Sequence, residues 1–161
     1  KDVCDRFAAE GFTALAPDLY HGESTTSPDD AGKLMMAINI DKTEQDMRGA
    51  IQYLLERDET KGDKVGTVGF CMGGQLSLYA ACANPQVPVL GFFGEKDSMV
   101  TPEIAQNLEK QLKDAGKQVE IHIYPDADHA FFNDSRTEVY NKEFADDTWQ
   151  RMLALYRENL G

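Results

Sequence analysis

The sequence predicts an α/β fold in which helices cover both faces of a parallel β-sheet. Four short apolar segments have the length of buried strands: residues 12–15, 64–68, 87–93 and 119–124. Segments with the hydrophobic period of amphipathic helices separate them. Right-handed crossovers between such strands give a parallel sheet with all strand carboxyl ends at one edge. We therefore expect a three-layer α/β/α sandwich, formed by a single domain over residues 1–161.

Helices are expected before, between and after the strands. Gly11 is placed to stop the first helix, and Asp41 or Thr43 can cap the third. Pro102 suits the first position of the helix that follows the third strand. The expected helical segments are residues 2–10, 31–38, 43–57, 74–83, 102–115 and 142–159.

The segment Gly69-Phe70-Cys71-Met72-Gly73 lies between an expected strand and an expected helix. A strand, a tight turn flanked by glycines and a helix form the setting of a nucleophile elbow. Gly69 and Gly73 are expected to avoid clashes in that turn. The helix N-terminus favours a thiolate, so Cys71 is the candidate nucleophile. The backbone N–H of Met72 is the candidate donor to a developing oxyanion.

A thiol nucleophile needs a base, and two histidines follow Cys71 in the sequence. His129 lies in a turn-rich loop after the strand at 119–124, where parallel sheets place functional side chains. His122 lies within that strand, on the face shared with Glu120. We therefore expect His129 to be the base.

The expected acid is Asp97, a few residues beyond the strand at 87–93. Its carboxylate could accept a hydrogen bond from the His129 ring and fix the tautomer. Glu95, Asp126 and Asp128 are alternatives, and Glu95 is the most credible of the three. The order of nucleophile, acid and histidine along the chain is that of α/β-hydrolases.

Four segments of the chain resemble the dienelactone hydrolase family, a cysteine-nucleophile branch of the α/β-hydrolases. They are Phe-Thr-Ala-Leu-Ala-Pro-Asp-Leu-Tyr at 12–20, Val-Gly-Phe-Cys-Met-Gly-Gly at 68–74, Gly-Glu-Lys-Asp at 94–97 and Asp-His-Ala-Phe at 128–131. By this resemblance Cys71, Asp97 and His129 match the family's triad. The resemblance implies hydrolysis of small-molecule lactones or esters through a thioester intermediate.

The chain also differs from the family's usual pattern. Members normally have further strands before the segment that begins here at Lys1, and so the sequence resembles a truncated member. A loop of that part supplies a second oxyanion donor and a glutamate that contacts the cysteine. Members also carry a strand where this chain has only Pro85 to Val87, and an arginine where it has Asn133. An alternative is therefore a non-catalytic relative that binds a ligand or partner.

Composition disfavours several classes of function. The net charge of −12, from 16 basic and 28 acidic residues, disfavours nucleic acid or an anionic membrane surface as a partner. Apolar runs have only strand length, so no transmembrane helix is expected. The three histidines lack ligand spacing, and neither a metal nor a cofactor is expected. The three cysteines match no metal-binding pattern, and a working thiol suits a reducing compartment such as the cytoplasm.

Two further expectations concern binding surfaces. Tyr20 and Phe131 are candidates for lining an apolar substrate pocket, although the same aromatic side chains would fit ordinary core and rim packing. An exposed sheet edge beside the strand at 12–15 is a site where a second copy could pair. That edge makes a homo-oligomer an expectation.

Overall fold

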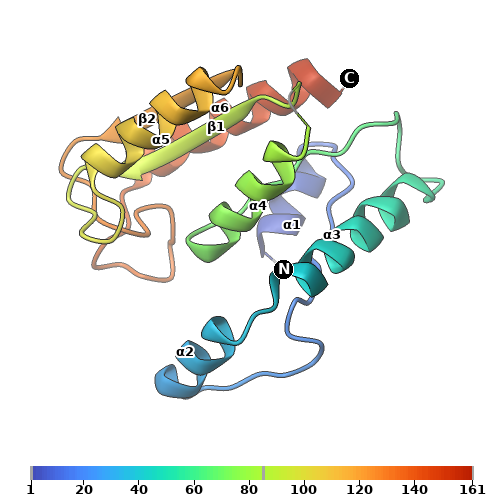
Figure 1. Ribbon diagram of the computed structural model, residues 1–161, viewed down its shortest axis with the longest axis horizontal. Helices are drawn as coiled ribbons and strands as arrows, with labels where there is room; N and C mark the ends of the chain where they lie inside the picture. Colours follow the sequence, from blue (N-terminus) through green and yellow to red (C-terminus); the bar gives the residue numbers. More distant parts are fainter. Residues whose placement is uncertain (1, 85, 161) are drawn as a thin grey trace. The chain divides into compact units, whose positions relative to one another are not determined.

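The computed structural model describes residues 2–84 and 86–160, which form an α/β structure of two compact units. The first unit ends at Val65 and the second begins at Gly66. The first contains helices α1 (Asp2–Ala9), α2 (Pro28–Met36) and α3 (Ile40–Leu55) (Figure 1). The second contains α4 (Met72–Cys82), β1 (Val89–Gly94), α5 (Pro102–Asp114), β2 (Val119–Tyr124) and α6 (Lys142–Leu160). Among these helices none combines the length and the apolar character that crossing a bilayer requires.

Local sequence signals explain how the helices of the first unit begin and end. Gly11 follows α1 with a φ of 90°, a conformation that suits glycine, and its N–H donates to Ala8 O. Helix α3 is capped by Asn39, whose side-chain oxygen accepts from Lys42 N at 3.0 Å. The predicted caps, Asp41 and Thr43, are therefore wrong. Asn39, which precedes both of them, has the extended backbone of an N-cap residue and provides the side-chain acceptor for a helix N–H.

Residues 12–15 and 64–68 are not strands in the structure, so the prediction of four strands is wrong at both segments. A β-strand is held by hydrogen bonds to a neighbouring strand. Neither segment pairs with a strand among the described residues. Thr67 O instead accepts a hydrogen bond from Tyr156 Oη of α6 at 2.8 Å. The sheet edge expected beside residues 12–15 is also absent, and the homo-oligomer stays a prediction without that strand.

The sheet of the second unit is a parallel pair formed by β1 and β2. Its register runs from Val89 opposite Val119 to Gly94 opposite Tyr124. Both strands agree with the predicted segments to within two residues at either end. Helix α5 connects them and packs on both, and α6 contacts β1 (Figure 1). Because successive side chains of a strand alternate between faces, the two helices can cover opposite faces of this pair.

An aromatic cluster fills the core beside the carboxyl end of β2. The Tyr124 ring lies 4.7 Å from the Phe144 ring and 5.2 Å from the Phe131 ring, measured between centroids. The Tyr124 hydroxyl donates to Asp147 Oδ2 at 2.6 Å. Burial, together with this carboxylate, raises the pKa of Tyr124 to about 12. The phenol therefore remains a neutral donor that joins β2 to α6.

Lys117 is a buried cation just before β2, with 8% of its surface exposed. Its ammonium donates to the backbone oxygens of Ala81, Asn84 and Val87. These oxygens lie in the last turn of α4 and in the segment that leads to β1. Carbonyls at a helix C-terminus lack intrahelical partners and favour a nearby positive charge. Lys117 therefore fixes the connection between α4 and the strand pair.

We expect Lys117→Met to lower the free energy of unfolding by about 2 kcal/mol, because the substitution leaves backbone oxygens without their charged donor. The midpoint of urea unfolding measures this loss. Lys113→Met is the matched control, since the Lys113 side chain is exposed and pairs with Glu109 of the same helix. That control is expected to cost less than about 0.5 kcal/mol. Equal midpoints for the two variants would contradict the role given to Lys117.

Candidate active site

A histidine–aspartate pair forms where the two strands end. Asp97 follows β1 and His129 follows β2. The ring atom His129 Nδ1 lies 2.6 Å from Asp97 Oδ2, within hydrogen-bonding distance. The Asp97 side chain is 6% exposed, whereas the His129 side chain is 30% exposed. The carboxylate is thus enclosed and the imidazole remains accessible from solvent.

Hydrogen bonds hold Asp97 in its charged form. Its Oδ1 accepts from the backbone N–H groups of Met99 at 2.8 Å and Val100 at 3.0 Å. Burial alone would raise the pKa of the Asp97 carboxyl, but the bonds from Val100, His129 and Met99 outweigh it and lower that pKa. A fixed carboxylate with a lowered pKa is suited to orient a histidine ring.

Of the four carboxylates considered as the acid, the structure brings Asp97 to the histidine. Glu95 Oε2 accepts instead from the backbone N–H of Asp126 at 2.9 Å. The Asp126 carboxylate pairs with Lys96 at 3.0 Å. His122, the other histidine of this unit, pairs with Glu120 at 2.6 Å on β2.

Cys71 lies in a strained turn immediately before α4. Its φ of 53° and ψ of −120° form a conformation that is rare for a residue with a side chain. A Cβ added to Gly69 would lie 1.9 Å from Gly73 O, so the turn requires glycine at position 69. A Cβ added to Gly73 would meet nothing within 4 Å, which corrects the expectation that both glycines avoid a clash. The strained turn and the helix after it agree with the predicted nucleophile elbow, whereas the strand expected before the turn is not formed.

An aromatic contact joins the elbow to the loop that carries the histidine. The rings of Phe70 and Phe132 stack with their centroids 5.1 Å apart. Phe70 precedes Cys71, and Phe132 lies three residues after His129. Within residues 2–84 and 86–160, however, the Cys71 sulfur forms no hydrogen bond with the His129 ring. The structure thus shows a direct contact between Asp97 and His129. The segments that carry Cys71 and His129 are in contact through the stacked rings of Phe70 and Phe132.

The other predicted site residues occupy different environments. Met72 is the first residue of α4, as an oxyanion donor requires, and its role stays a prediction. Phe131 is 6% exposed and belongs to the aromatic core, which fits the alternative of ordinary packing. Tyr20 lies in the first unit, where its backbone N–H donates to Asp18 Oδ1 at 3.0 Å. A substrate contact by Tyr20 stays a prediction.

The structure contains a second histidine–aspartate pair that the sequence analysis did not predict. In the first unit His21 Nε2 lies 2.8 Å from Asp46 Oδ2, and both residues line a surface hollow with Tyr53. The two residues are far apart in the sequence, and only the backbone path brings them together. The residues that line this hollow include no cysteine or serine.

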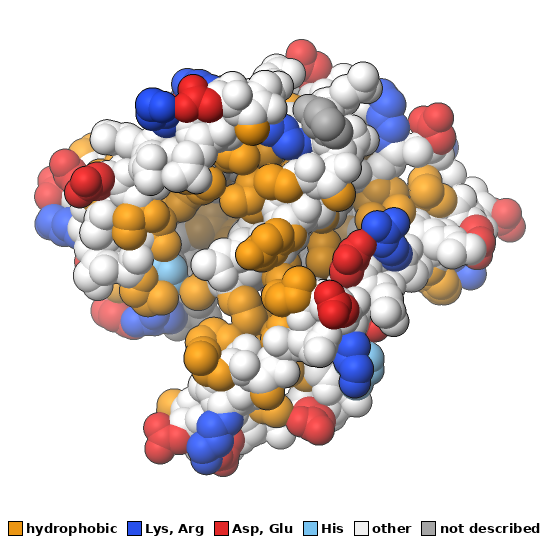
Figure 2. Space-filling model, in the orientation of Figure 1, with side chains coloured by type: hydrophobic (Ala, Val, Ile, Leu, Met, Phe, Trp, Pro, Cys, Tyr) orange, Lys and Arg blue, Asp and Glu red, His pale blue; other side chains and the backbone are white. Residues whose placement is uncertain are grey.

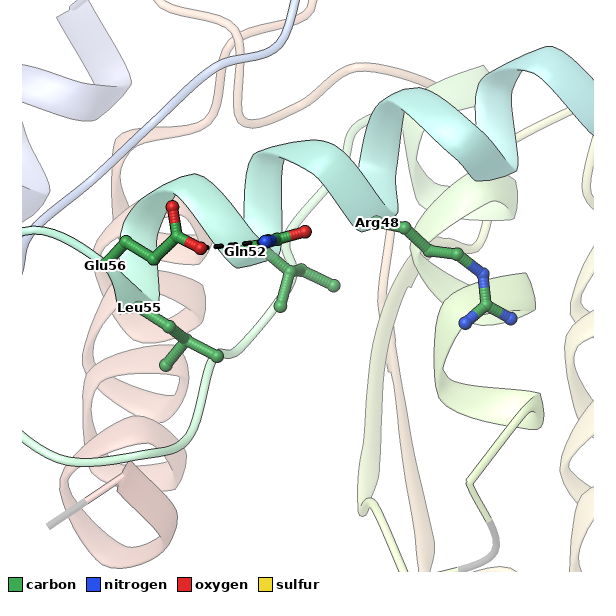
Figure 3. A pocket seen from close by; sticks show the side chains of 5 residues that line it. Arg48, Gln52, Leu55 and Glu56 are labelled. Carbon is green, nitrogen blue, oxygen red and sulfur yellow. Dashed lines mark hydrogen bonds between the residues drawn. The ribbon is translucent and has the colours of Figure 1, made fainter.

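Helix α3 also lines a hollow of its own. Figure 3 shows Arg48, Gln52 and Glu56 with Leu55 on successive turns, and Gln52 Nε2 donates to Glu56 Oε1 at 2.7 Å. The residues that line this hollow include no cysteine, serine or histidine. Across the described part of the chain, no three His, Cys, Asp or Glu side chains are grouped to hold a metal ion.

Comparisons with known proteins agree on one family. The model of the family described as "Dienelactone hydrolase family" matches residues 1–87 and 80–160. "Protein usf" of Aquifex pyrophilus is 34% identical over 186 aligned residues, covering 99% of this chain and 80% of that protein. "Putative carboxymethylenebutenolidase" of Aquifex aeolicus (strain VF5) is 30% identical, with the same coverage.

One solved structure is similar to this chain over almost its whole length. It is the crystal structure of a "Putative Dienelactone Hydrolase" from Klebsiella pneumoniae subsp. pneumoniae MGH 78578. The two share 28% sequence identity and superpose with a TM-score of 0.86. The match covers 97% of this chain and 79% of the other.

Proposed function

Because the chain belongs to the dienelactone hydrolase family, we propose that it hydrolyses lactones or carboxylic esters with Cys71 as nucleophile, His129 as base and Asp97 as orienting acid. The observation that carries this proposal is the 2.6 Å contact between His129 Nδ1 and Asp97 Oδ2 at the ends of adjacent parallel strands. The strained backbone of Cys71 at the start of α4 supports the choice of nucleophile. The relatives named as carboxymethylenebutenolidases support a lactone as substrate.

The first half of the proposed reaction acylates the cysteine. His129 Nε2 takes the thiol proton while the sulfur attacks the carbonyl carbon. The carbonyl π electrons move to oxygen, and the Met72 N–H stabilises the negative charge that forms. Collapse of the adduct breaks the carbon–oxygen bond to the leaving group. The alkoxide takes the proton from His129 and leaves as an alcohol, or stays attached through the chain of an opened lactone.

The second half releases the acid. His129 removes a proton from water, and the resulting hydroxide attacks the thioester carbon. Collapse of this adduct breaks the carbon–sulfur bond and gives a carboxylic acid and the thiolate, which the His129 proton restores to the thiol. Asp97 keeps its charge throughout and stabilises the imidazolium. The lowered pKa of Asp97 is suited to this task.

The wider setting of the site is also part of the proposal. We propose that the strand pair with α5 and α6 is the portion of a three-layer α/β-hydrolase sandwich that holds the acid and the base. A working thiol is maintained in a reducing compartment, which makes the cytoplasm the proposed location. No cofactor enters the reaction.

Hydrolysis of 4-nitrophenyl acetate and of a simple aromatic lactone tests the proposal. We expect turnover of both substrates, and inactivation by iodoacetamide at a rate that follows alkylation of Cys71. The peptide that contains residue 71 is identified by mass spectrometry. The enzymatic function would be overturned if the folded, unmodified protein hydrolyses neither substrate although its Cys71 thiol reacts with iodoacetamide.

A non-catalytic relative that binds a ligand is the second candidate. The observation that favours it is the lack of a hydrogen bond between the Cys71 sulfur and the His129 ring among the described residues. Catalytic hydrogen bonds are often long before substrate binds, so the proposal of an enzyme stands beside this observation. The same hydrolysis assay separates the two candidates.

A further inference from the structure

The loops that carry the proposed acid and base are also held together by hydrogen bonds other than the contact between Asp97 and His129. We define the acid loop as residues 95–100 and the histidine loop as residues 125–133. Glu95 N donates to Tyr124 O at 2.9 Å, and Lys96 N donates to Ala127 O at 2.8 Å. These two backbone bonds extend the pairing of β1 and β2 beyond the strand ends.

The backbones of the two loops pack closely at this junction. A Cβ added to Gly94 would lie 2.4 Å from Ala127 O and 2.8 Å from Asp128 O. Real Cβ atoms do not approach a backbone oxygen so closely, so only glycine allows the two loops to meet at this distance. The histidine loop therefore lies directly against the end of β1.

One side chain completes the junction. Glu95 Oε2 accepts a hydrogen bond from the backbone N–H of Asp126 at 2.9 Å. Asp126 has a φ of 55°, a left-handed conformation that is uncommon for a residue with a side chain, although aspartate adopts it more often than most. The Asp126 carboxylate in turn lies 3.0 Å from Lys96 Nζ. Both partners of Asp126 thus come from the acid loop.

We propose that Glu95 is a positioning residue for the hydrolysis. Its carboxylate holds the backbone of Asp126 in the left-handed conformation, and this sets the path of the histidine loop so that His129 meets Asp97. The inference rests on the proposed function, in which His129 is the base. It assigns Glu95 a task that acts through the histidine loop, since its carboxylate is bonded to Asp126 N and not to the His129 ring.

Three substitutions of Glu95 separately test the length of the side chain, its negative charge and its role as hydrogen-bond acceptor. Glu95→Ala removes the acceptor, and we expect kcat to fall about tenfold with KM within about twofold, as the loss of one charge-assisted hydrogen bond would give. Glu95→Gln keeps a side-chain oxygen at the same reach and should retain kcat within about twofold. Glu95→Asp keeps the charge but is shorter, so it should behave like Glu95→Ala.

Glu109→Ala is the matched control, because it removes another glutamate that bonds to a neighbouring group, Lys113 on α5. This control is expected to leave kcat unchanged. A proton NMR signal from the Nδ1–H of His129, shifted to low field by the bond to Asp97, gives a readout that needs no turnover. We expect this signal in the wild-type protein and in Glu95→Gln, and its loss or broadening in Glu95→Ala and Glu95→Asp.

The outcomes distinguish this inference from the proposed function. If the wild-type protein lacks hydrolytic activity, the function fails, and the NMR signal still tests the positioning. If the wild-type protein is active but Glu95→Ala keeps both kcat and the signal, the positioning role is overturned. The same conclusion follows if Glu95→Gln loses as much activity as Glu95→Ala.

Discussion

Cys71→Ala is expected to lower kcat/KM for 4-nitrophenyl acetate by about a thousandfold or more, because the variant has no atom that can form the acyl intermediate. The initial rate at pH 7 to 8 measures this loss. Mass spectrometry of the quenched reaction should find an acetyl group on the peptide of residue 71 in the wild-type protein. The same peptide of the variant should carry none.

Cys82→Ala provides the control for this experiment. Cys82 is also an exposed free cysteine, but it lies at the last position of α4, away from the elbow at the start of that helix. Its replacement should leave kcat/KM within about twofold. Activity that survives in Cys71→Ala and disappears in Cys82→Ala would exclude the elbow as the site of acylation.

Asp97→Asn is expected to lower kcat by about a thousandfold, with little change in KM. The reason is that an amide N–H can donate a hydrogen bond to the His129 ring, whereas the carboxylate accepts one from it. The new side chain can present an N–H to His129 Nδ1, which then acts as acceptor. The ring proton is displaced to Nε2, the atom that must take the proton from the Cys71 thiol. Steady-state kinetics that separate kcat from KM measure the effect.

Asp128→Asn is the control for charge near the ring. Asp128 precedes His129 and is exposed, so its loss should change kcat less than about threefold. A loss in Asp128→Asn as large as that in Asp97→Asn would indicate a general field effect rather than a specific orienting bond. Unchanged activity in Asp97→Asn would remove the acid from the mechanism.

Asp97→Asn is also expected to change how the stability of the protein depends on pH. The pKa of Asp97 is lower in the folded protein than its ordinary value. Its carboxylate therefore stabilises the fold above the unfolded-state pKa, and this contribution is lost as the pH falls through the folded-state pKa. Urea unfolding should accordingly show wild-type protein more stable than Asp97→Asn at neutral pH, with the difference narrowing in acid.

The sequence predicted the part of the fold whose signals are local. Alternating or continuous apolar residues located β1 and β2, and the proline after Thr101 located the start of α5. The glycines around Cys71 predicted a tight turn before a helix, and the structure has that turn. Asp97 and His129 could be paired in advance because parallel strands bring their carboxyl ends to one edge.

Strand formation at 12–15 and 64–68 could not be predicted from those segments alone. Strands need partners, and a suitable apolar segment without a neighbour does not become one. The alignment with the Aquifex pyrophilus relative spans 186 positions, more than the 161 residues of this chain. The family model matches in two segments that overlap at residues 80–87, and the resemblance described above places a missing strand in the same region. Whether an apolar segment forms a strand thus depends on the rest of the chain, which has to supply the neighbouring strand.

Side-chain exposure also depended on the whole chain. Helix α4 is strongly apolar, yet Leu76 is its only residue that is buried within the described part of the chain. Tyr79 is 65% exposed, and Figure 2 shows hydrophobic side chains at the surface. Apolar composition predicts burial only where another element is present to cover the helix.

The one-to-one alignment of β1 with β2 limits which changes of chain length the protein can tolerate. Asp97 and His129 meet because Gly94 stands opposite Tyr124 and each loop leaves its strand from that point. Deleting one residue inside either strand would turn the following side chains to the other face and separate the carboxylate from the imidazole. Length variation among natural homologues should therefore be concentrated elsewhere, for example in residues 134–138, which are exposed.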